Sequence, residues 1–218
     1  MHRRRRTALS VSAALLCAAP FLAACGSDAH PGAAAVVGGQ RIAVSSVQAQ
    51  VKDVRTAQAG SANAADLVKN TGQLGRAKLH TLIFDQVLAR AADDAGIKVS
   101  RKEIQDARKS WIQQAGSEEK VEQTLLQQNG IAPSQIDDFA REQVLVSKLA
   151  SQLGVDPTSQ AGNKQLLTVL SDASKKLKID VNPRYGEWNN QQVALDNAKA
   201  PWITQVTKEP QPAAQAGA

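Results

Sequence analysis

Apolar side chains recur with the period of an α-helix along most of this chain, most strongly between residues 74 and 95. Residues spaced four apart lie on one face of a helix, and this segment holds two such rows side by side. The rows are Leu79, Ile83, Val87 and Ala91, and beside them Phe84, Leu88, Ala92 and Ala95. Because the two rows make a wide apolar face, we predict a helix in the middle of the fold.

Serine caps and glycine ends indicate the helices on either side of it. Ser45 or Ser46 begins a helix that runs to about residue 59, and the polar stretch 60–70 breaks the pattern. Gly96 ends the central helix, and Ser100 with Glu103 forms a capping box for the next one. That next helix directs three residues inward, namely Ile104, Ala107 and Trp111.

Three more helices are predicted in the second half of the chain. One spans about 118–128 and ends at Gly130, the next is capped by Ser134 and ends at Gly154, and the last follows Pro157. Gly162 weakens the helical pattern in the first turns of the last helix. The inward stripes are Phe139, Val146, Leu149 and Leu153, then Leu166, Val169, Leu170, Ala173 and Leu177.

Short strands are predicted near both ends of this helical region. Residues 35–37 and 40–42 flank a Gly38-Gly39 turn, and residues 178–181 alternate in polarity. We expect the late strand to pair with the early hairpin, since a sheet edge would otherwise stay open. The predicted fold class is mostly α, with about six helices and this small sheet.

The first 25 residues have the composition of an export signal. Arg3 to Arg6 form a positive start, Ala8 to Leu22 form an apolar run too short to span a bilayer, and Ala23-Ala24 lead to Cys25. The end of this segment resembles the bacterial lipobox, which implies cleavage between Ala24 and Cys25 and a lipid thioether on Cys25. The weak match after Arg6 favours general secretion over the twin-arginine route.

Removal of the predicted signal, residues 1–24, changes the apparent charge of the chain. The signal carries four of the 26 basic residues and none of the 20 acidic ones, so the net charge of the remaining chain is +2, compared with +6 for the full sequence. This argues against nucleic acid as a partner, and the Lys175-Lys176 and Lys178 cluster suits a solvated helix end. We expect a tether at 25–35, a domain at 36–206 and a disordered tail at 207–218.

Three segments, in order, resemble the N-terminal helical domain shared by SurA-type, PrsA-type and trigger-factor-type chaperones. They are residues 36–45, where Gly38 replaces the usual Asn, then 91–104 and 125–149. The resemblance covers roughly residues 36–153 and implies a fold and a chaperone-related role. Each segment is also accounted for by caps and core residues alone, so it specifies fold more than function.

The chain departs from those chaperones in a way that bears on catalysis. SurA and PrsA types carry a parvulin prolyl isomerase module between the helical region and the final strand, whereas only residues 155–177 stand there in this chain. After the signal only His30 and His80 remain, and His80 fits a half-exposed helical position better than a general base. We therefore expect no enzyme, no metal and no cofactor.

Two functions remain open at this level. The first is a lipid-anchored chaperone or holdase that binds unfolded or newly exported polypeptides outside the cell membrane. The second is an envelope scaffold lipoprotein with one dedicated partner, which the absence of any methionine beyond Met1 favours. The candidate peptide-binding residues are Trp111, Phe139, Tyr185 and Trp188, although packing of the last strand is the preferred role for Tyr185 and Trp188.

Overall fold

The computed structural model describes residues 32–197, which form seven α-helices and five strands. The first elements are β1 Ala33–Val37, β2 Gln40–Ala43, α1 Val44–Ala59, α2 Ala64–Asn70, α3 Leu74–Asp94 and α4 Arg101–Ala115. The others are α5 Glu118–Asn129, α6 Ile136–Leu153, α7 Gln160–Lys176, β3 Asp180–Val181, β4 Glu187–Asn189 and β5 Ala194–Asp196. The predicted fold class, mostly α with a small sheet, is confirmed, while Ala24, Cys25 and the predicted tail lie outside the described residues.

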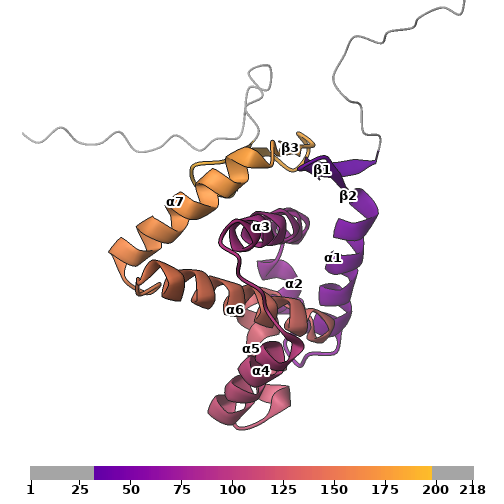
Figure 1. The fold of residues 1–218 in the computed structure, drawn as a ribbon. Coiled ribbons are helices and arrows are strands. Elements are labelled where there is room, and N and C mark those ends of the chain that lie inside the picture. The colour runs from indigo at the N-terminus through magenta and orange to yellow at the C-terminus, as the bar shows by residue number, and fades with distance from the viewer. Residues whose placement is uncertain (1–31, 198–218) are drawn as a thin grey trace, which may run out of the picture.

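Helix α3 is the centre of the molecule. It packs against α1, α6, α7 and β1, and Figure 1 shows it enclosed by these elements. The predicted row of Leu79, Ile83, Val87 and Ala91 is fully buried. In the neighbouring row Leu88 and Ala92 are buried, whereas Phe84 and Ala95 are half-buried at the edge of the core.

The small sheet joins the two ends of the described chain. β1 pairs antiparallel with β2 on one side and with β3 on the other, so that Val36 lies opposite both Arg41 and Asp180. This confirms the predicted pairing of the late strand with the early hairpin. β1 begins at Ala33, so Ala33 to Ala35 belong to the sheet and not to the expected tether, because their small side chains are buried in the core.

The start of the helical region differs from the prediction in two places. Helix α1 begins at Val44, and neither Ser45 nor Ser46 caps it, because the chain enters the helix directly from β2. The polar stretch after residue 60 contains a short helix, α2. The guanidinium of Arg55 on α1 donates to the hydroxyl (2.7 Å) and the carbonyl (2.9 Å) of Thr71, which attaches the end of α2 to α1.

The helices of the second half follow the predicted order with local differences. Ser134 lies in a 3-10 turn, Pro133–Gln135, ahead of α6 and does not cap that helix. Leu149 is buried as predicted, but Leu153 is exposed because α6 extends past the core at its end. Gly162 is required in the first turn of α7, where a Cβ would clash with the carbonyl oxygen of Asp156.

A second hairpin, β4–β5, follows the sheet and was not predicted. Arg76 of α3 holds it by donating to the carbonyl oxygen of Leu195 and to the side chain of Asn197, both at 2.5 Å. The indole N–H of Trp188 donates to the hydroxyl of Ser174 at 2.8 Å. The hairpin therefore closes the core over α3 and α7 with a buried, satisfied aromatic residue.

Truncation of a core residue on α3 tests the central position of this helix. We expect Leu79→Ala to lower the free energy of unfolding by about 3 kcal/mol, because the site is enclosed on all sides and leaves a cavity. Urea denaturation followed by circular dichroism measures the change. Val68→Ala, at a side chain that is 44% exposed, is the matched control, and equal losses for the two variants would contradict the packing described.

Candidate functional site

Helices α4 and α5 form a hairpin that extends away from the sheet. Figure 1 shows the hairpin at the end of the molecule opposite β1. α4 packs against both α5 and α6, yet none of its residues is fully buried. The predicted inward residues Ile104, Ala107 and Trp111 are half-buried, so the apolar face of α4 stays partly open to solvent.

An open apolar cleft lies where α4, α5 and α6 meet. Its volume is about 470 Å³, and we call it the aromatic cleft. The rings of Trp111 and Phe139 face each other in it, with centroids 5.6 Å apart and planes 39° apart. Its main lining residues are Trp111, Ala115, Val121, Leu125, Phe139 and Gln143. Aromatic and aliphatic side chains around an open hollow are the surface that an apolar side chain of a partner can enter.

A single arginine ties together the three helices of the cleft. The guanidinium of Arg108 on α4 donates to Glu118 at the start of α5 and to Asp137 at the start of α6, both at 2.6 Å. Both carboxylates lie in first helical turns, where the helix dipole also favours negative charge. These charged contacts add to the buried side chains of α5, of which Leu126 packs in a small apolar cluster with Val54 of α1 and Leu74 of α3.

A second, polar hollow adjoins the cleft between α1, α3 and α6. Its volume is about 200 Å³, and we call it the ionic cavity. The ammonium group of Lys78, only 5% exposed, donates to the side-chain oxygen of Gln135 at 2.7 Å, and Gln135 donates to the carbonyl oxygen of Gln50. Its main lining residues are Gln50, Lys78, Asp85, Asn129, Asp138 and Glu142.

Burial disfavours the charged forms of the groups in the ionic cavity. Desolvation raises the pKa of Glu142 to about 7 and the pKa of Asp85 to about 6, and in each case a nearby carboxylate adds to the rise. Desolvation also lowers the pKa of Lys78 to about 8, against the opposing influence of Asp53 and Asp85. The cavity therefore holds three groups that titrate between about pH 6 and 8.

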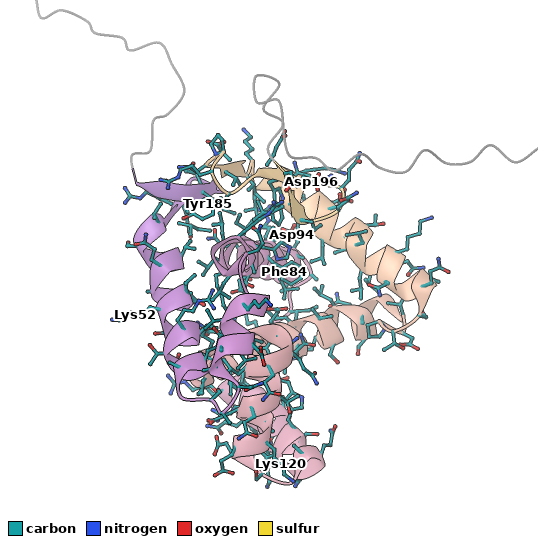
Figure 2. The ribbon with its side chains drawn as sticks, turned by 180° about the vertical axis from the view of Figure 1, so that it is seen from behind. Lys52, Phe84, Asp94, Lys120, Tyr185 and Asp196 are labelled. Carbon is teal, nitrogen blue, oxygen red and sulfur yellow. The ribbon has the colours of Figure 1, made fainter. Side chains whose placement is uncertain are left out.

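The other two candidate aromatic residues lie elsewhere. Figure 2 shows Tyr185 at the end of the molecule opposite Lys120, which is on the α4–α5 hairpin. Tyr185 is half-buried against the main core, and Trp188 is 8% exposed, so both have the packing role. Trp111 and Phe139 come together in the cleft, and Tyr185 and Trp188 do not join them.

His80 also has a packing role. Its ring stacks on Phe84 with centroids 6.0 Å apart and lies beside Trp188, and its Nε2–H donates to the carbonyl oxygen of Val193. Burial lowers the pKa of His80 and so favours the neutral ring, against the opposing influence of the hydrogen bond to Val193. Among residues 32–197 no group of three or more His, Cys, Asp or Glu side chains could hold a metal ion.

Comparison with known families identifies the fold. The family of the SurA-like N-terminal domain matches residues 1–150, and the chain belongs to this family. Membership supports a chaperone-related role in protein folding outside the cytoplasm and the binding of polypeptide substrates. Neither the curated proteins nor the solved structures include a significant match. In the described part of the chain, no helix is both long and apolar enough to cross a membrane.

Sequence patterns alone did not reveal the ionic cavity, although a signal for it was present. Lys78 and Asp85 stand seven residues apart on the most apolar helix of the chain, which places both on one face. Gln135 and Glu142 have the same spacing at the start of α6. Polar residues seven apart on two largely apolar helices could have predicted a buried polar site, provided that the two polar faces were expected to meet.

The raised pKa of Glu142 predicts that this side chain destabilises the protein at neutral pH. A folded-state pKa of about 7, above the ordinary value of 4.5, means that folding stability declines as the pH rises from about 4.5 to 7. We expect Glu142→Gln to raise the free energy of unfolding by about 1 kcal/mol at pH 7.5, allowing for solvent in the cavity.

The same comparison at pH 4.5 provides the internal control. There the folded protein carries a protonated Glu142, so the advantage of the glutamine variant should disappear. Asp172→Asn on α7 removes an exposed carboxylate and should change the stability by less than about 0.5 kcal/mol at both pH values. Urea titrations at the two pH values measure the effect, and a pH-independent difference would contradict the burial of this charge.

Proposed function

We propose that this protein is a lipid-anchored chaperone of the holdase type, which binds unfolded or newly exported polypeptides in the aromatic cleft. The observation that carries the proposal is the open Trp111–Phe139 pair between three helices. Exposed apolar side chains of an unfolded chain would bury their surface against these rings, since removal of apolar area from water favours binding at roughly 25 cal/mol per Å².

The arrangement of the domain is compatible with an anchor at Cys25. β1, the first described element, lies at the end of the molecule opposite the α4–α5 hairpin (Figure 1). A lipid on Cys25 would hold the sheet end nearer the bilayer and leave the aromatic cleft facing away from it. Cleavage before Cys25, the lipid itself and location on the outer face of the cell membrane are parts of the proposal.

The proposed activity does not include prolyl isomerisation. Between the end of α6 at Leu153 and the start of β3 at Asp180, the chain forms the single helix α7. An inserted parvulin module would have to occupy this connection. The one histidine among residues 32–197, His80, is engaged in packing with Phe84 and Trp188.

Removal of the cleft aromatics tests the holdase activity. We expect Trp111→Ala or Phe139→Ala to weaken the suppression of aggregation of a chemically denatured client by roughly tenfold, because central aromatic anchors dominate binding surfaces. Light scattering at increasing ratios of chaperone to client measures it. Leu167→Ala removes an apolar side chain that is 38% exposed on α7, and this control should retain full activity. Wild-type protein that never slows aggregation would refute the proposal.

The anchor is tested separately from the cleft. We expect Cys25→Ser to shift the protein from the membrane fraction to the soluble fraction after cell lysis, since a serine hydroxyl cannot form the thioether. Immunoblotting of the fractions measures the distribution. Membrane association that is unchanged in this variant would contradict the lipid anchor, and it would leave the cleft proposal as it stands.

A scaffold with one dedicated partner is the second candidate. The observation that favours it is the composition of the cleft, which contains tryptophan, phenylalanine, leucine and valine but no methionine. Promiscuous binding surfaces often use methionine because its side chain adapts to different partners. Purification from membranes distinguishes the two, because many weakly bound polypeptides support the holdase and one stoichiometric partner supports the scaffold.

A further inference from the structure

The ionic cavity holds more negative than positive charge. Three carboxylates line it, those of Asp85, Asp138 and Glu142, against the single ammonium group of Lys78. Within residues 32–197 none of the three forms an ion pair or a side-chain hydrogen bond, because Lys78 donates to the neutral side chain of Gln135. Lys78 in the wall and the nearby Arg141 offset part of this negative charge, but no side chain pairs directly with any of the three carboxylates in the described part of the chain.

The ionic cavity and the aromatic cleft share a wall. The side chain of Phe139 lines both hollows. On α5, Leu125 in the cleft and Asn129 in the cavity lie one helical turn apart on the same face. On α6, the neighbouring residues Glu142 and Gln143 face the cavity and the cleft, respectively. The two hollows therefore follow one another along the same pair of helices.

We propose that the ionic cavity binds a lysine or arginine side chain of the polypeptide whose neighbouring apolar side chain occupies the aromatic cleft. This inference rests on the proposed function and adds a preference for one class of client segment. The hollow of about 200 Å³ is larger than the terminal group of either basic side chain. An entering cation would meet carboxylates that lack partners, so charge complementarity selects the occupant.

The titration of the cavity carboxylates makes peptide binding depend on pH, which gives the proposal a second readout. Glu142 and Asp85, with pKa values of about 7 and 6, become fully ionised only above neutral pH. The charged groups that act on Asp85 are Lys78 from the same helix and Asp138 and Arg141 from α6, while Glu142 is affected by Asp85. Asp53 of α1 acts on Lys78. Since the carboxylates gain negative charge as the pH rises from 5.5 to 7.5, a basic peptide should gain affinity over this range while a neutral one should not.

Binding of matched peptides to the full chain tests the preference. The probes are three otherwise identical nine-residue peptides with a central leucine-phenylalanine pair, followed by lysine, glutamine or glutamate. Fluorescence anisotropy at pH 7.5 and low salt measures their dissociation constants. We expect the lysine peptide to bind about tenfold more tightly than the glutamine peptide and the glutamate peptide to bind most weakly.

Variants assign this difference to the cavity. Glu142→Gln and Asp85→Asn should each reduce the lysine advantage, which is the ratio of the dissociation constants of the glutamine and lysine peptides, to about threefold or less. Asp172→Asn, the exposed control on α7, should keep the full advantage. Trp111→Ala should weaken the binding of all three peptides by the same factor, because it removes the apolar contact that they share. Circular dichroism and urea denaturation show whether each cavity variant is folded.

The outcomes separate this inference from the proposed function. Equal affinities for the lysine and glutamine peptides in the wild-type protein would overturn the inference and leave the holdase proposal intact. A lysine advantage that persists in both cavity variants would place the basic side chain elsewhere and also overturn it. Failure of all three peptides to bind would refute peptide binding in the aromatic cleft, and the inference with it.

Discussion

The burial of α3 is the constraint on which the rest of the structure depends. It packs against α1 and β1 as well as α6 and α7, so segments from the start and the end of the domain contact one helix. Burial of Leu79, Ile83, Val87 and Leu88 removes large side chains from water on several sides at once. The sheet and the β4–β5 hairpin then close the same core, with Arg76 and His80 of α3 binding the hairpin backbone.

The α4–α5 hairpin is not part of that core, and this difference leaves the aromatic cleft open. α4 has no fully buried residue, and Arg108 connects it to α5 and α6 through partly exposed ion pairs. Such pairs contribute little to stability, so the position of the hairpin depends on apolar contacts: the buried Leu126 of α5 with Val54 and Leu74, and the half-buried Trp111 with Phe139. α5 is therefore anchored by buried side chains, whereas α4 is held by half-buried contacts and partly exposed ion pairs.

The charged groups of the ionic cavity lower the stability of the protein. A hydrophobic replacement of Lys78, Asp85 or Glu142 would remove the cost of desolvating charge beside the core. Instead the chain places these groups on α3 and α6, next to the cleft, where their pKa values are shifted toward neutrality. Perturbed titratable groups beside a hollow are typical of functional sites, and this is the physical basis for connecting the cavity with the cleft.

The sequence by itself determined the elements whose signals are local. The two rows of α3, the capping box of Ser100 and Glu103, the left-handed glycine after α5 and the pairing of β3 with the early hairpin were all predictable. Trp111 and Phe139 were also predictable as candidates, though not as a contacting pair. The packing role of Trp188 was also expected, but only the tertiary structure decided that its indole N–H donates to Ser174. It also decided that Arg55 of α1 holds the end of α2, and that Lys78, Asp85 and Glu142 share a cavity. These features depend on residues far apart in the chain, whose meeting is set by how α1, α6 and α7 pack around α3.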